Sequence, residues 1–71
     1  MAIITNKIRL LRFLAGEMTQ QELAERVSVT RQTILSIENG KYYPSLELAY
    51  KIAEVFEKPL DEVFSYSSGE Q

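Results

Sequence analysis

A row of polar side chains lies along a short predicted helix in the middle of the chain. Within residues 30–39, TRQTILSIEN, four polar residues fall on or near one side at helical spacing: Arg31, Gln32, Ser36 and Asn39. Ile34 and Ile37 take the opposite side, where they would face a core. Guanidinium and amide groups that point outward have little to do in a core, so this helix is predicted to contact a partner.

The stretch before that row is predicted to be a second short helix followed by a tight turn. Thr19 and Glu22 have the S/T-x-x-E spacing of a capping box, which begins a helix after the threonine. Ser28 and Val29 form the turn, and Thr30 is the expected N-cap of the next helix. The inner face of the first helix is supplied by Leu23, Ala24 and Val27. Residues 20–39 are therefore two helices around which the remaining chain is organised.

Three further helices are expected on either side of this pair. The first starts near Asn6, buries Ile8, Leu11 and either Leu14 or Ala15, and ends at Gly16. Asn39 and Gly40 end the polar helix, and the next helix is capped by Ser45. Its predicted core face comprises Leu46, Ala49, Ile52, Ala53 and Phe56. After Lys58-Pro59 breaks the chain, residues 60–64 fit one last short helix.

The two ends of the chain are β-prone. A small antiparallel ribbon is predicted between roughly Ala2–Thr5 and Phe64–Ser67, with a frayed polar tail over residues 68–71. A ribbon of two strands is marginal alone and would depend on packing against helices or a second subunit. The expected architecture is thus one domain, residues 1–71, with five helices and a possible ribbon.

Composition narrows the function classes. The 71 residues include no cysteine and no histidine, which removes disulfides, most zinc sites and two common catalytic residue types. We therefore expect no enzyme, cofactor or metal. The first residues are too short for a signal peptide and no apolar run approaches roughly 18 residues, so a cytoplasmic protein without membrane contact is expected. The net charge is −2, but six of the eight basic residues precede Pro44 and six of the ten acidic residues follow it.

The chain resembles the Cro/CI-type (XRE family) helix-turn-helix DNA-binding proteins, and in particular the very short dimeric repressors of that family. The resemblance is carried by TQQELAERV, VTRQTILSIENGKYYPSLELAYKIAEVF and PLDEVF, and covers nearly everything from Asn6 to Phe64. It implies an all-α, five-helix, lambda-repressor-like domain whose second motif helix enters the major groove of double-stranded DNA. The implied function is transcription regulation, as a homodimeric repressor at a palindromic operator. The alternative is an antitoxin or other protein-interaction module, whose main partner is a protein.

The resemblance also implies roles for individual residues. By motif position, Arg31, Gln32 and Ser36 would contact base edges, and Gln20 would approach a phosphate at a helix N-terminus. Arginine can donate two hydrogen bonds to guanine O6 and N7, and the glutamine amide can pair with adenine N6 and N7. Ser36 either contacts a base or permits close approach, and Leu35 either touches a thymine methyl or lies at the surface. Chemistry suits five more residues to phosphate contacts: Thr30, Thr33, Asn39, Lys41 and Tyr43.

Some expectations concern packing and backbone. Tyr42 is expected to pack into the core, which leaves Tyr43 for phosphate. The family usually carries glycine at the motif turn, so Ser28 should cost about 1 kcal/mol if its φ is positive. From the family's ion pair we expect Arg12 to meet Glu38. The closing segment completes the core, forms a dimer interface with its symmetry mate, or does both, through Leu60, Val63, Phe64 and Tyr66, with Leu60 and Val63 leading the interface.

Overall fold

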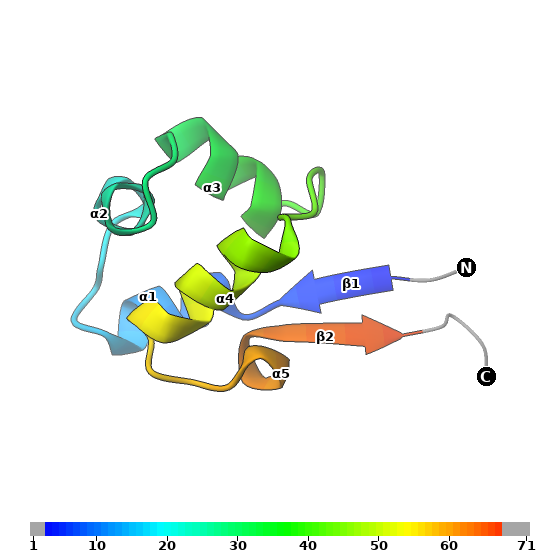
Figure 1. Ribbon diagram of the computed structural model, residues 1–71. Helices are drawn as coiled ribbons and strands as arrows, with labels where there is room; N and C mark the ends of the chain where they lie inside the picture. The colour runs from blue at the N-terminus through cyan, green and yellow to red at the C-terminus, as the bar shows by residue number, and fades with distance from the viewer. Residues whose placement is uncertain (1–2, 68–71) are drawn as a thin grey trace.

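Five helices and a two-stranded antiparallel sheet make up the part of the chain that the structure, a computed structural model, describes (residues 3–67, Figure 1). The elements follow the chain as β1 (Ile3–Asn6), α1 (Ile8–Leu14), α2 (Gln20–Arg26), α3 (Arg31–Glu38), α4 (Leu46–Val55), α5 (Leu60–Val63) and β2 (Phe64–Ser67). The predicted helical fold with a small ribbon is confirmed.

Three helices begin at side-chain caps. Thr19, Thr30 and Ser45 each accept a hydrogen bond on the side-chain oxygen from the backbone N–H three residues later, at 3.0, 3.2 and 3.1 Å. Thr19 also donates its own N–H to the Glu22 carboxylate at 2.8 Å, which completes the capping box. All three predicted helix starts are confirmed, because each cap satisfies a backbone donor that has no partner within the helix.

The ribbon joins the two ends of the described chain. β1 and β2 pair antiparallel, with Ile3 opposite Ser67 and Asn6 opposite Phe64. One more hydrogen bond, from Lys7 N to Val63 O at 2.9 Å, continues the pairing into the helices. The predicted first strand lies one residue further along than expected. Residue 2 of that prediction, and the tail over residues 68–71, lie outside the described residues.

The core lies between the helices. α3 lies at one side of the core and α1 at another, with α4 crossing between them (Figure 1). All five helices contribute to the buried cluster: Ile8, Leu11, Met18, Leu23, Ala24, Val27, Ile34, Ile37, Ile52, Ala53 and Val63. The inner faces predicted for residues 20–39 are confirmed. Between residues 3 and 67 no polar or charged residue is fully buried.

One residue of the predicted α4 core face is wrong. Leu46 is 66% exposed, although Ala49, Ile52 and Ala53 of the same prediction are buried. Leu48 and Val55 pack against the core instead. At 100° per residue, these two positions displace the centre of the apolar stripe away from Leu46. The first apolar residue after the cap is therefore left in solvent.

Candidate nucleic-acid interface

The turn between α2 and α3 fixes how the two helices meet. Ser28 has a φ of +63°, so the left-handed conformation expected at this position is present on a serine. The N–H of Val29 donates to Ala24 O at 3.0 Å and closes the turn. Ala24 itself is fully buried, and α2 packs directly on α3. A small residue at this position allows the two helices to approach closely.

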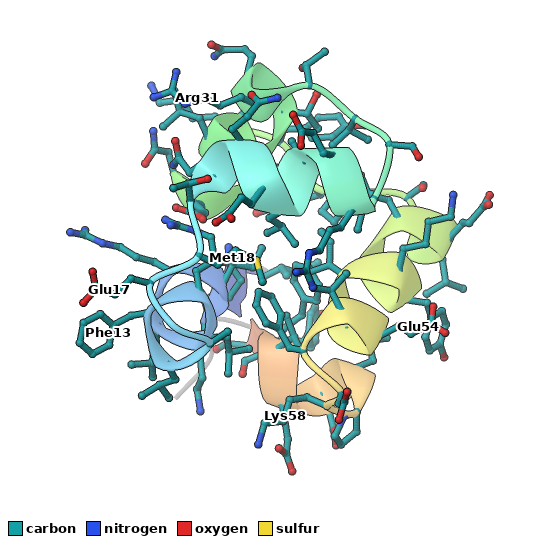
Figure 2. All side chains as sticks on the ribbon, turned by 90° about the vertical axis from the view of Figure 1, so that its left-hand side faces the viewer. Phe13, Glu17, Met18, Arg31, Glu54 and Lys58 are labelled. Atoms are coloured by element: carbon teal, nitrogen blue, oxygen red, sulfur yellow. The ribbon has the colours of Figure 1, made fainter. Side chains whose placement is uncertain are left out.

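α3 divides into a buried side and an outer side. Ile34 and Ile37 are buried, whereas Arg31 and Gln32 are exposed at the N-terminal end. Figure 2 shows Arg31 at the edge of the domain, pointing away from the core. Thr33, Leu35 and Ser36 are partly exposed along the helix. The helix therefore presents an arginine and a glutamine from a rigid, anchored backbone, as the sequence predicts.

An ion pair ties the C-terminal end of α3 to α1. Arg12 Nε donates to Glu38 Oε2 at 2.7 Å and Arg12 Nη2 to Glu38 Oε1 at 3.0 Å, which confirms the predicted pair. The third nitrogen, Nη1, donates to the backbone oxygen of Met18 at 2.8 Å. A planar guanidinium that uses all three nitrogens has one orientation, so it sets the position of α3 relative to α1 and the following loop.

Gln20 joins the same group of contacts. Its Nε2 donates to Glu38 Oε1 at 3.2 Å, so the side chain points toward the ion pair. The sequence reasoning considered Gln20 only as a phosphate contact and missed this role, which only its place across from Glu38 in the folded chain reveals. The Glu38 carboxylate thus receives hydrogen bonds from α1 and from the first residue of α2.

Asn6 is a second anchor that the sequence reasoning missed. Its Nδ2 donates to Ile37 O at 3.0 Å, and its Oδ1 accepts from Ile8 N at 3.1 Å. An asparagine just before a helix is a common cap, and this signal was available in the sequence. The contact with Ile37 was not, because it joins residues 31 positions apart.

The residues predicted to contact phosphate lie at the two ends of α3. At the N-terminal end, the Thr30 and Thr33 hydroxyls are 3.1 Å apart. At the other end, Asn39, Lys41 and Tyr43 are exposed on the segment that follows the helix. The positive φ of Gly40, +75°, turns the chain there.

Tyr42 differs from expectation. It is 48% exposed, about as much as Tyr43 at 52%, so the prediction that Tyr42 packs into the core is wrong. The segment between α3 and α4 runs over the surface, as most loops do, and leaves both rings in solvent.

The predicted interface residues have different surroundings. Val63 is only 1% exposed and belongs to the core, so its predicted role in an interface is wrong: it has no surface to offer a second copy. Leu60, Phe64 and Tyr66 line a surface hollow together with Ile4 and Tyr50. Leu60 and Phe64 also pack against the core, whereas Tyr66 is exposed.

Other kinds of site find no support in the described chain. Nowhere in residues 3–67 do three or more acidic side chains come together in a way that would hold a metal ion. None of the helices in the same range has the length and hydropathy that a membrane span requires.

Known proteins share this sequence and fold. A family model described as helix-turn-helix matches residues 8–63. An uncharacterised HTH-type transcriptional regulator of Methanocaldococcus jannaschii is 46% identical over 65 residues, 92% of this chain and 97% of that protein. Another, from Archaeoglobus fulgidus, is 55% identical over 53 residues, 75% of each chain.

A solved structure supports the fold. A crystal structure from Bacteroides fragilis, described as a candidate DNA-binding protein, superposes with a TM-score of 0.76 at 24% sequence identity, covering 89% of this chain and 100% of that one. With the match of the family model over residues 8–63, the chain belongs to the XRE-type helix-turn-helix family of DNA-binding transcriptional regulators.

Proposed function

We propose that the protein is a homodimeric repressor that reads a palindromic operator through the major groove. The observation that carries this proposal is the outer side of α3, where Arg31 and Gln32 are exposed on a helix held by buried Ile34 and Ile37. An exposed donor pair on an anchored helix suits direct readout, because an α-helix fits the major groove and base edges there differ in hydrogen-bonding pattern.

Arg31 and Gln32 are the proposed principal readers. Arg31 has no ion-pair partner within residues 3–67, so its guanidinium is available to donate to guanine O6 and N7. Gln32 would pair with adenine. Each good bidentate contact supplies about 1–3 kcal/mol of discrimination against the wrong base. Ser36, one turn further along and partly exposed, is the third proposed base contact.

The proposed phosphate contacts flank this row. Thr30 and Thr33 lie at one end of α3, and Asn39, Lys41 and Tyr43 at the other. Such contacts position a protein on the duplex without selecting a sequence. Gln20 is proposed to act through the start of α2, since its side-chain amide is held by Glu38.

The proposed dimer forms through Leu60, Phe64 and Tyr66, which line one hollow on α5 and β2. One motif makes few contacts, whereas a two-fold dimer reads two half-sites about 34 Å apart. A bound dimer would repress by occupying an operator that overlaps a promoter.

The test is selection of bound sequences from a random duplex pool, followed by gel shifts with the selected site. We expect a palindromic consensus that wild type prefers over random DNA. Arg31→Glu with Gln32→Ala should abolish that preference, and Lys51→Ala, on the far helix α4, should not. An unenriched pool at low salt would contradict the proposal. Should the double variant retain a stoichiometric protein partner from the native host, the antitoxin alternative gains support.

A further inference from the structure

The outer face of α1 carries large apolar side chains with nothing packed on them. Leu10, Phe13 and Leu14 are 51, 63 and 67% exposed, whereas Ile8 and Leu11 of the same helix are buried. Figure 2 shows Phe13 pointing away from the body of the domain. A cluster of exposed apolar side chains on one helix marks an interaction surface more often than a solvated one. We call Leu10, Phe13 and Leu14 the α1 patch.

Opposite charges flank the α1 patch at its two ends. Lys7 lines one surface hollow with Leu10 and Phe13. Glu17 lines the adjacent hollow with Phe13, and Figure 2 shows the two side chains next to each other. Neither Lys7 nor Glu17 forms an ion pair within the described chain. The patch therefore runs from a positive end to a negative end, with apolar side chains between them.

This arrangement is complementary to itself. In sequence, Lys7 precedes Leu10 by three residues and Glu17 follows Phe13 by four. If two copies of α1 pack antiparallel about a two-fold axis, Leu10 meets Phe13 of the second copy, and Lys7 meets its Glu17. We propose that the α1 patch is an isologous contact between two copies of this chain, separate from the interface proposed on α5 and β2.

Position and size indicate when this contact operates. The α1 patch shares no residue with the hollow of Leu60, Phe64 and Tyr66, so one copy can make both contacts. α3 lies elsewhere on the domain and remains open to DNA (Figure 1). Three side chains offer much less than the roughly 800 Å² per partner of a standard stable interface. The contact therefore forms between dimers already held on neighbouring sites, where DNA raises their effective concentration.

The inference rests on the proposed function, since it requires dimers bound to operators. The experiment compares binding to a duplex with one selected operator and to a duplex with two, separated by a whole number of helical turns. For wild type, we expect occupation of one operator to tighten binding at the other by about 5- to 150-fold, the usual range of coupling between sites. Leu10→Ser with Phe13→Ser should remove this coupling while single-operator affinity and melting temperature stay unchanged.

A charge exchange identifies the occupant. Lys7→Glu alone and Glu17→Lys alone should each reduce the coupling, because like charges then face each other across the axis. The double variant restores opposite charges and should recover the coupling, which only a contact between copies predicts. Lys51→Glu, a lysine reversal outside the α1 patch, is the matched control and should have no effect.

Each result decides the question. Wild type that binds single operators without coupling at any spacing overturns the inference and leaves the proposed function intact. A double variant as impaired as the single variants also overturns it, and indicates a different protein as occupant. If single operators are not bound, the proposed function fails, and sedimentation at high protein concentration decides instead: self-association must be lost in both single variants and regained in the double variant.

Discussion

The Arg12 guanidinium and the Glu38 carboxylate meet at two points, with Nε to Oε2 at 2.7 Å and Nη2 to Oε1 at 3.0 Å. Their side chains are only 14 and 8% exposed. Arg12→Ala would leave a largely buried carboxylate without its main donor, which should lower the free energy of unfolding by about 3 kcal/mol. Urea denaturation followed by circular dichroism measures the loss. Lys51→Ala removes the exposed pair with Glu47 and should cost about 0.3–0.5 kcal/mol, so equal losses would contradict the prediction.

Asn6 makes two contacts that can be removed separately. Asn6→Ser keeps an oxygen that can accept from Ile8 N but loses the donor to Ile37 O, and should cost about 1 kcal/mol. Asn6→Ala loses both contacts and should cost about 2 kcal/mol. Thermal and urea unfolding of both variants give the order. Finding Asn6→Ser as unstable as Asn6→Ala would show that the cap contributes nothing.

Ser28 holds a left-handed backbone, with φ at +63°, while its side chain is exposed. Glycine adopts this conformation without the steric cost, so Ser28→Gly should stabilise the domain by about 0.5–1 kcal/mol. Ser28→Ala keeps the Cβ and should leave stability nearly unchanged, which separates the backbone effect from loss of the hydroxyl. Melting temperatures decide, and a destabilised glycine variant would refute the expected strain.

Lys41 tests the distinction between positioning and reading. If it neutralises one phosphate, Lys41→Ala should weaken binding to operator and random DNA alike, and should reduce the slope of log K against log salt by about 0.9. Titrations over a series of salt concentrations measure the slope. Lys58→Ala, an exposed lysine at the far side of α4, is the matched control. An unchanged slope for Lys41→Ala would remove Lys41 from the set of phosphate contacts.

Local chemistry made much of the fold predictable. Thr19, Thr30 and Ser45 cap helices because capping depends on residues within four positions of each other. The inward side of α3 followed from the spacing of Ile34 and Ile37. The pairing of the ribbon was also anticipated, within one residue, since only two β-prone segments remained.

Contacts that depend on tertiary placement were not predictable in the same way. The hydrogen bond from Gln20 to Glu38 joins polar groups 18 positions apart, and no periodicity relates them. The Arg12 pair with Glu38 was anticipated only through family resemblance. Val63 and Leu46 were misplaced for a common reason: an apolar residue at the edge of a short helix is buried or exposed according to the angle at which that helix packs.

The ribbon pairs residue 3 with residue 67, so it joins opposite ends of the described chain. On the ribosome, β1 emerges first and stays unpaired until β2 has followed it, whereas α2 and α3 are neighbours in sequence and can pack earlier. Asn6, the last residue of β1, holds the C-terminal end of α3 through Ile37. The nascent chain therefore gains its final anchor on α3 only as synthesis passes β2, and a chain terminated before residue 64 would carry the whole motif without the ribbon that completes it.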